Sequence, residues 1–581
     1  MITFNKTTFV IPRASAKDYL LYGFESKGNV VIPPHYQPKS FAGDTLLWVL
    51  PVNPDEAEAY QLRGGAYQVK KGGGSIRVTF IGEYEKRVFS ARPACDIFGR
   101  GIKLEMPNGA RFEQAYARFY WDNLLPQIAE RTLMRDKLDI REGYVFSTLN
   151  KAAYAGTYPA VDHEFHMKGR FAVGGAAEAS LTRRMLELQL KVMREDETGK
   201  SKNLCAVQPN GAREYDVWRK SQNRKCKAQM FRVTANIEFI EGVYNYYCLT
   251  KDIEFLRANI DAIERNCAYI ESFIDTDDLL NSHVYYEDQV MKDGKVAQAQ
   301  CFAVNSFRLM EQLELLLARV GQAEHYGTMA RRLGEALARE YPKGFWDAQN
   351  GRFIDWIDAK GEAHDHVHLL ANELPTMLGL ADEAQARQCA AAIAGCAEVF
   401  GKFPSFVAAK IEDYTKAEIG SGGPYDLCAA GRYWCWDAEY LASSGDGEAL
   451  LRQLLQVADQ AALDGFLMGE RYDMNYVYYN TGEDGKRNWH GASLYYEYPN
   501  VFLYVLVCHY LGVRRGFDCD LVVNPLIPEG TVTLETYGLS YHLTKEGRLF
   551  LTNLGGRPLS VDLPRLNRRV NLEAGETLAV T

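Results

Sequence analysis

The sequence predicts a mainly helical protein with β companions. We expect a toroid of paired helices, flanked by an N-terminal β-sandwich and a small C-terminal β domain. Gly- and Pro-punctuated strand patterns fill the first hundred or so residues, long amphipathic helices dominate residues 160–515, and apolar–polar alternation returns after Gly512. The length of 581 residues also exceeds one ordinary core, because single cores stop growing near ~250–300 residues.

Residues 1–111 are predicted to form the sandwich. Thr45–Val52, Ala66–Val69 and Ile76–Phe80 carry β-branched and aromatic residues, and Gly-rich or Pro-rich turns separate them, which is typical of antiparallel strands. The pattern becomes helical from Phe112 to about Met134. We therefore expect residues 112–159 to link the sandwich to the helical domain.

Residues 160–515 are predicted to form the toroid, because helix pairs joined alternately by short and long loops build a closed ring of α-hairpins. Apolar residues recur at helical spacing in Gly175–Arg194, Ala235–Leu249, Ile253–Phe273, Ala299–Val320, His325–Glu340, Leu369–Leu380, Ala384–Ile393, Leu427–Ala442, Glu448–Ala462 and Ala492–Leu511. Residues 516–581 then form the C-terminal β domain.

The charge of the chain argues against two classes of partner. Its formal net charge is −9 and its pI is near 5.8, whereas a phosphate backbone or an anionic membrane needs a basic face. The densest basic stretch, Arg213 to Lys227, is short and has acidic and aromatic neighbours, so a solvated face explains it. No stretch of ~18 apolar residues is present to span a bilayer. We expect neither nucleic acid nor membrane as the main partner.

Several features suggest a cytoplasmic protein. The start, MITFNKTTFVIPR, lacks the basic and apolar regions of a signal peptide. The 12 cysteines form no CxxC pair, and several lie in apolar helical patterns, such as Cys248, Cys267, Cys301 and Cys508. In a chain this long we expect reduced, buried thiols rather than a disulfide framework.

The first candidate for chemistry is the loop His283–Gly294, where Glu287 and Asp288 follow two tyrosines. Aromatic walls and a like-charged neighbour both raise the pKa of a carboxyl group. A general acid needs a raised pKa to hold its proton near neutral pH. A surface loop with ordinary acidic residues is the alternative interpretation.

A second candidate is Glu470, in the aromatic-rich stretch Gly469–Ser493. Arg471 beside it favours the ionised carboxylate, which suits a general base. Two carboxyl groups of this kind, at ~6.5–9.5 Å, are what glycosidic hydrolysis with inversion requires. The alternative is a structural loop that leads into the last helix.

Three histidines alternate in His364-Asp-His-Val-His368. From one face of a strand, alternating imidazoles could ligate Zn²⁺. The run leads directly into the helix predicted at Leu369, where alternation is lost, and no Cys lies nearby. We expect no metal, and favour sugar hydrogen bonding or a structural role.

Four segments, in order, resemble motifs of a known superfamily. Tyr285–Gly294 resembles the "DWADQVLRSG" segment of amylo-α-1,6-glucosidase-like proteins, and Ser421–Tyr425 the "N-G-G-x-W" loop. Glu470–Asp473, with Thr481-Gly-Glu483 and Trp489–Ser493, is similar to the "E-x-Y-D … T-G-E … W-x-x-A" block of glucoamylases. Gly516–Pro528 resembles the "G-L-x-I-D-P-x-I-P" entry into a C-terminal β domain. Together they cover about residues 160–530 and identify a six-hairpin, (α/α)6-barrel glycosidase.

The resemblance implies an exo-acting, inverting glycoside hydrolase that needs no cofactor and acts on a small carbohydrate. It implies Asp288 as general acid, with Glu287 as the rival, and Glu470 as general base. The residues expected to contact substrate are Arg170 (in a segment before the first barrel helix), Trp218, Tyr286, Trp356, Asp355, His366, Tyr425, Trp489 and His490. Tyr285 and Tyr286 replace the first Asp and the Trp of the "DWAD" pattern, which leaves the sugar open.

Other interpretations remain. A disaccharide phosphorylase of the same fold would use phosphate in place of water, although no cluster of Arg, His and Thr is evident. A non-catalytic sugar-binding protein would not need the acidic pair. An α/α-barrel lyase or epimerase would use a Tyr/His pair on uronic acids. The sugar, anomer, linkage and any homo-oligomer stay open.

Overall fold

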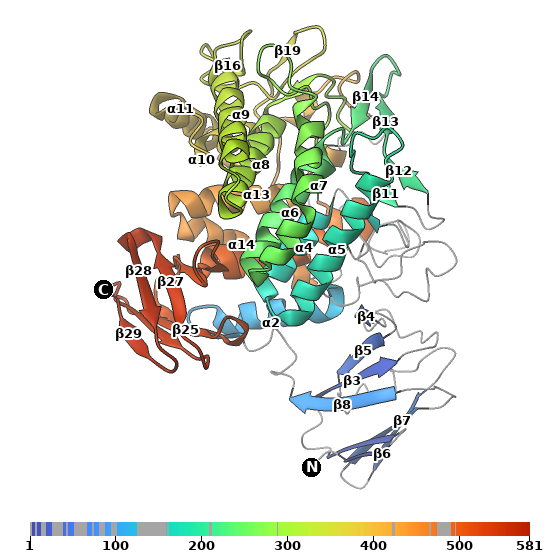
Figure 1. Cartoon of the computed structure of the whole chain (residues 1–581), viewed down its shortest axis with the longest axis vertical. Coiled ribbons are helices and arrows are strands. Elements are labelled where there is room, and N and C mark those ends of the chain that lie inside the picture. The colour runs from blue at the N-terminus through green and yellow to red at the C-terminus, as the bar shows by residue number, and fades with distance from the viewer. Residues whose placement is uncertain are drawn as a thin grey trace.

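The computed structural model describes residues 102–124, 158–159, 162–207, 212–287, 289–420, 425–463, 466, 468–472, 490–493 and 495–580, and the backbone of eight strands before residue 94. It is mainly helical with several small sheets, as predicted. The N-terminal strands, the helical body and the C-terminal strands follow one another along the chain in Figure 1.

The predicted helices are present with small shifts of their ends. They are α5 (Ala176–Arg194), α6 (Thr234–Thr250), α7 (Ile253–Glu271), α8 (Ala297–Leu316), α9 (Val320–Ala338), α10 (Leu369–Met377), α11 (Glu383–Ala394), α13 (Gly431–Ser444), α14 (Gly447–Leu463) and α15 (Glu497–Tyr504). Short α12 (Ala397–Phe400) follows α11, and α15 continues as a π-helical segment, Val505–Tyr510. Local sequence fixes some of these ends: Asp382 and Gln385 form a capping box at the start of α11.

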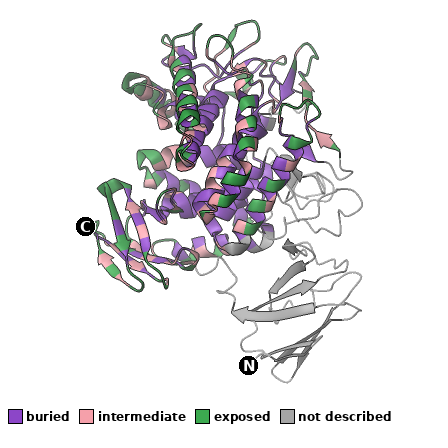
Figure 2. Cartoon of the chain, in the orientation of Figure 1, coloured by how far each residue is buried: buried purple, intermediate pink, exposed green. Residues whose placement is uncertain are grey.

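Six helices contact one another in a cyclic order. Each of α4 (His163–Val173), α6, α8, α10, α13 and α15 contacts the next, and α15 contacts α4. The other helices pack against them: α5 contacts α4 and α6, α7 contacts α6, α9 contacts α8, α11 contacts α10 and α14 contacts α13. The predicted linker helix is α2 (Gly109–Phe119), which contacts α14 and α15. Figure 2 shows buried residues concentrated on the inner helices.

Helix α4 corrects the sequence prediction, which placed the first helix of this domain at Gly175. All eleven residues of α4 are buried although many are polar, so it shows no amphipathic pattern. The reason is an ionic interior: the ammonium group of Lys168 lies 2.8 Å from Glu164, 3.0 Å from Glu241 on α6 and 3.1 Å from Glu439 on α13. Buried charges are tolerated when they are paired in this way.

A mixed sheet and an antiparallel sheet follow the helices along the chain. Their strands are β22 (Val513–Arg515), β23 (Leu521–Val523), β24 (Gly530–Leu534), β25 (Leu539–Leu543), β26 (Leu549–Asn553), β27 (Leu559–Leu563), β28 (Arg568–Leu572) and β29 (Thr577–Ala579). The orders are β22-β23-β27-β28 and β29-β26-β25-β24-β9. In β26 and β27 every second residue is buried, which matches the alternation in the sequence.

The strand β9 (Ile102–Glu105) belongs to the C-terminal sheet. It lies inside the range assigned to the N-terminal sandwich, residues 1–111, but pairs antiparallel with β24, Ile102 opposite Leu534. Its neighbour α2 contacts it directly. The chain thus enters the helical body beside the C-terminal sheet.

Eight N-terminal strands form two four-stranded antiparallel sheets, β1-β2-β7-β6 and β4-β5-β3-β8. The strands are β1 (Thr3–Asn5), β2 (Thr8–Pro12), β3 (Tyr19–Glu25), β4 (Lys39–Phe41), β5 (Thr45–Pro51), β6 (Tyr67–Gly72), β7 (Ser75–Phe80) and β8 (Arg87–Pro93). The three predicted strands correspond to β5, β6 and β7. Gly72 pairs with Ser75, so two glycines alone connect β6 and β7, as tight hairpins prefer.

Short strands occupy the connections between helices. They are β10 (Tyr158–Pro159), β11 (Ala206–Val207), β12 (Arg213–Glu214), β13 (Val217–Lys220), β14 (Lys227–Met230), β15 (Lys295–Val296), β16 (Trp346–Asp347), β17 (Arg352–Phe353), β18 (Trp356–Ile357), β19 (Ala363–His364), β20 (Gly469–Arg471) and β21 (His490–Ser493). The pairing of β20 with β21 corrects the predicted helix Ala492–Leu511, which starts only at Glu497.

Candidate functional site

Glu287 lies in a buried ionic cluster. Its Oε1 accepts from Lys292 Nζ at 2.7 Å and from His368 Nε2 at 2.6 Å, and its Oε2 accepts from Gln298 Nε2 at 2.6 Å. Lys292 Nζ also lies 2.7 Å from Asp355 Oδ1. The backbone N–H of Ala371 donates to His368 Nδ1, so the proton of this imidazole is on Nε2 and points at Glu287.

This environment holds Glu287 ionised. Burial opposes ionisation, but the charge of Lys292 and the hydrogen bonds from His368 and Lys292 outweigh it and keep the pKa of the Glu287 carboxyl well below its usual range. Both carboxylate oxygens accept hydrogen bonds from protein donors. A general acid must carry a proton, so this arrangement argues against Glu287 as the acid.

We predict that Lys292→Met destabilises the fold by about 3 kcal/mol. The substitution leaves Glu287 and Asp355 buried without their shared cation, and breaking a buried ion pair costs ~3–5 kcal/mol. Urea unfolding of the intact chain measures the loss. Lys360→Met, at an exposed position on a nearby loop, is the matched control. Equal free energies of unfolding for the two variants would contradict the prediction.

The three histidines do not converge. His364 Nδ1 and His366 Nε2 lie 2.6 and 3.1 Å from the same oxygen of Glu418, while His368 turns to Glu287. The His366 ring also stacks on the Tyr414 ring, with the two ring centres 3.7 Å apart. Among the described residues, Glu287, Asp355 and His368 have a spacing that could hold a cation, but the ammonium of Lys292 already lies against both carboxylates.

Glu470 lies in β20 within a second buried ionic network. Arg471 Nη2 is 3.7 Å from Glu470 Oε1 and 3.4 Å from Asp426 Oδ1. The second terminal nitrogen of this guanidinium, Nη1, is 3.3 Å from Glu497 Oε1. The same oxygen also accepts a hydrogen bond from Arg432 Nε at 2.7 Å. The positive charge next to Glu470 favours its carboxylate form, as a general base requires.

Asp162, at the start of α4, completes this network and was missed from sequence. It lies 3.7 Å from Arg432 and accepts from the Tyr495 hydroxyl at 3.4 Å. Burial, together with the negative charges of Glu497 and Glu470, raises the pKa of its carboxyl to about 6 despite Arg432. This carboxyl, close to Glu470, therefore keeps its proton up to about pH 6.

We predict that Asp162 makes stability pH-dependent. Its folded pKa of about 6 exceeds the ordinary 3.8, so the folded chain binds more protons between these values. Stability therefore falls as pH rises through this window and is constant above it. Relative to Asp162→Asn, which cannot ionise, the wild type should lose about 3 kcal/mol between pH 3.5 and pH 7. Urea unfolding at each pH measures the free energy of unfolding, and an equal change with pH in the two proteins would contradict the prediction. Asp261→Asn, at an exposed position, is the control.

The two networks approach each other through Asp426. The backbone N–H of Gln289, next in sequence to Asp288, donates to Asp426 Oδ2 at 2.5 Å, and Asp426 Oδ1 faces Arg471. Ala429, three residues after Asp426, also forms an isolated antiparallel β-bridge with Tyr472, two residues after Glu470. The segments that carry the candidate acid and base therefore meet at one residue, although they lie far apart in the sequence.

The predicted aromatic and acidic contacts Tyr286, Trp356 and Asp355 are fully buried. The ring of Tyr286 packs on Phe165 and Trp436. Trp356 stacks on His364 at 4.2 Å, and its indole N–H has no acceptor among the described residues. Contact of these three side chains with a substrate stays a prediction.

The position predicted for Arg170 was wrong. It lies inside α4, not in a segment before the first helix, and is fully buried. Its Nη1 donates to Glu178 on α5 at 2.9 Å, and its Nη2 to the carbonyl of Leu124 at 2.9 Å. These contacts join α4, α5 and the segment after α2.

Trp218, in contrast, is 44% exposed on β13. Asp288 and Trp489 lie outside the described residues, as do the side chains of Tyr425 and His490. Sequence reasoning also missed Lys292, Asp426, Arg432 and Glu497, and it named His368 only as part of the histidine run, without its contact to Glu287. The one available signal was Lys292, which lies in the same loop as Glu287.

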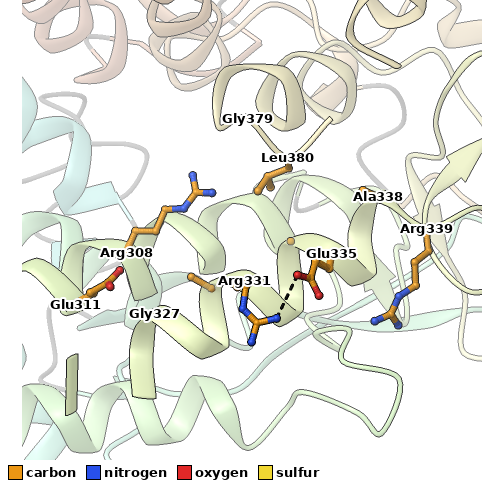
Figure 3. Close-up of a pocket in the computed structure, with 11 residues that line it drawn as sticks. Arg308, Glu311, Gly327, Arg331, Glu335, Ala338, Arg339, Gly379 and Leu380 are labelled. Atoms are coloured by element: carbon orange, nitrogen blue, oxygen red, sulfur yellow. Dashed lines mark hydrogen bonds and ion pairs between the residues drawn. The ribbon is translucent and has the colours of Figure 1, made fainter. Parts of the chain in front are cut away.

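Two cavities among the described residues contain none of the predicted catalytic residues. One, of about 490 Å³, lies between α8, α9 and the end of α10, and Arg308, Arg331 and Arg339 line it (Figure 3). The other, of about 610 Å³, lies beside Phe517 where the helices meet the C-terminal strands.

Two expectations about the whole chain are testable here. Cys248, Cys267, Cys301 and Cys508 are buried free thiols, as predicted. Within the described part of the chain, no helix has the length and apolar character needed to cross a membrane.

Comparison with known proteins gives matches of structure only. No family model and no curated protein matches this chain. A sialidase structure matches with a TM-score of 0.51 at 13% identity, over 97% of this chain and 60% of the other. A GH78 family rhamnosidase of Bacillus sp. GL1 matches with a TM-score of 0.49 at 15% identity, over 94% of this chain and 50% of the other. A putative kojibiose phosphorylase from the human microbiome matches with a TM-score of 0.48 at 8% identity, over 99% of this chain and 82% of the other. The chain spans half the length of that rhamnosidase. At these identities the likeness concerns the fold alone. The match to the sialidase covers 97% of this chain.

Proposed function

We propose that the protein is an inverting, exo-acting glycoside hydrolase that cleaves a terminal glycosidic bond. Asp288 is the general acid and Glu470 the general base. The helices form an (α/α)6 barrel, with α4, α6, α8, α10, α13 and α15 as its inner ring. The cyclic contacts of these six helices, each with an outer partner, support the barrel.

The observation that carries the proposal is the meeting of two acidic segments at Asp426. Gln289 and Arg471, the neighbours of Asp288 and Glu470, both bind this carboxylate. The electrostatics support the division of roles. Arg471 favours an ionised Glu470, and the cluster around Lys292 holds Glu287 as a carboxylate, which favours Asp288 over its rival Glu287 as the residue that carries the proton.

The reaction follows from these roles. Asp288 donates its proton to the glycosidic oxygen as the bond to the anomeric carbon breaks. A water molecule attacks this carbon from the opposite face while Glu470 removes its proton, so the configuration inverts. We expect the two carboxyl groups at ~6.5–9.5 Å, the separation that leaves room for this water.

Turnover of aryl glycosides tests the proposal. Rhamnosides, glucosides and mannosides of both anomers should include at least one substrate, and NMR of the first-formed product should show the inverted anomer. Hydrolysis that requires inorganic phosphate would assign a phosphorylase instead. Sugar binding without turnover of any glycoside would assign a binding protein.

A further inference from the structure

The hairpin β13–β14 presents an exposed face next to the candidate site. Its strands pair antiparallel, with Trp218 opposite Gln229 and Lys220 opposite Lys227. Trp218, Lys220 and Lys227 are exposed, as are Arg224 and Lys225 in the turn, whereas Val217 and Arg219 are half-buried. The turn is ordered: Asn223 Oδ1 accepts from the Ser221 hydroxyl at 2.7 Å, and Ser221 Oγ accepts from the N–H of Cys226 at 3.1 Å.

The exposed face is strongly basic in an acidic protein. Residues 220–227 read KSQNRKCK, with four cations and no acid, in a chain of formal net charge −9. Within the described residues, none of Lys220, Arg224, Lys225 and Lys227 forms an ion pair with a carboxylate. Lys220 and Lys227 stand directly opposite each other, and like charges in that position destabilise a strand pair.

Trp218 adds a second, independent feature. Of the tryptophans whose burial the structure describes, the others are buried and Trp218 alone is exposed, at 44%. Lys227 Nζ lies 4.2 Å from the centre of its ring. An exposed aromatic ring flanked by cations offers a flat apolar surface and positive charge side by side.

The hairpin is fixed to the segments of the candidate site at both ends. At its turn, Ser221 bridges Gly420, and the N–H of Gln222 donates to the carbonyl of Ile419 at 2.8 Å. Gly420 N–H donates in turn to the carbonyl of Gln289. At its base, Met230 bridges Val284, three residues before Glu287.

We infer that this hairpin is a binding subsite for an acidic saccharide, whose carboxylate groups contact Lys220, Arg224 and Lys225 while a sugar ring packs on Trp218. The inference rests on the proposed function and narrows its substrate class to acidic oligosaccharides. A sugar stacks its apolar face on an aromatic ring, and the neighbouring cations supply the partners that a carboxylate needs. A nucleic acid fits less well, because the cations are confined to one hairpin of an acidic chain.

Binding of matched probes tests this. The full chain carrying Glu470→Gln, which stops turnover, is titrated calorimetrically with an oligogalacturonate hexamer and with its neutral methyl ester. We expect the acid to bind about tenfold tighter at low ionic strength. The triple variant K220Q/R224Q/K225Q should lose this preference, since each exposed ion pair contributes a factor of about 1.5 to 5. The triple variant K545Q/R548Q/R568Q removes three exposed charges from the C-terminal domain and is the control.

Each outcome decides the question. Equal binding of acid and ester, or an unchanged preference in the hairpin variant, overturns the subsite. Equally tight binding of oligo-dT that the same variant abolishes also overturns it, in favour of nucleic acid. Tighter binding of a heparin hexasaccharide than of the oligogalacturonate overturns carboxylates as the bound groups, in favour of sulfates. Because turnover of neutral aryl glycosides tests the catalytic proposal separately, failure of one does not imply failure of the other.

Discussion

Glu470→Gln is expected to reduce kcat/KM by ~10²–10⁴-fold for every substrate, including those with activated leaving groups. Water activation is needed whichever group departs, so a better leaving group cannot compensate for a missing base. The glutamine keeps the size of the side chain but cannot accept the proton of water. A 4-nitrophenyl glycoside and an alkyl glycoside of the same sugar, assayed side by side, measure the effect.

Two further variants sharpen this experiment. Glu412→Gln removes a carboxylate at an exposed turn and should leave turnover near that of the wild type. Glu470→Ala supplied with azide should recover activity, because azide attacks without deprotonation, and the product should be the glycosyl azide of inverted configuration. Full activity of Glu470→Gln, or no recovery with azide, would contradict the role of Glu470.

The parts of the fold that sequence predicted well are those with a local pattern. The helix Ile253–Glu271 buries residues at helical spacing and is capped by Asp252, so one face carries the signal. Helix α4 lacks such a face, because Lys168 and Glu164 are buried against partners on other helices. Strand β9 pairs with β24, more than 400 residues later. Neither contact leaves a periodic trace in the sequence.

The candidate site divides in the same way. Glu287 and Glu470 were singled out from the sequence because they lie in aromatic-rich stretches beside recognisable motifs, and their catalytic roles stay predictions. Apart from Arg471, their partners were not singled out. His368 reaches Glu287 from the start of α10, and Asp162 reaches the Glu470 network from the start of α4. A pKa depends on such neighbours, which is why the sequence left Asp288 and Glu287 as rival acids.

Asp288→Asn is expected to affect substrates according to their leaving groups. An alkyl glycoside, whose leaving oxygen must be protonated, should lose ~10²–10⁴-fold in kcat/KM, while an activated aryl glycoside should lose far less. The basic limb of the pH profile should also disappear, since that limb reports deprotonation of the acid. A series of aryl glycosides with graded leaving groups measures this as a steeper dependence on leaving-group pKa.

Glu287→Gln is the comparison that decides between the rivals. Glu287 is a buried carboxylate held by Lys292 and His368, so its loss should lower stability and weaken turnover of all substrates alike, without a change in leaving-group dependence. A mild, uniform effect of Asp288→Asn together with a leaving-group-dependent loss in Glu287→Gln would transfer the acid role to Glu287. A first-formed product of retained configuration would contradict the whole mechanism, because retention requires a carboxylate to attack the sugar itself.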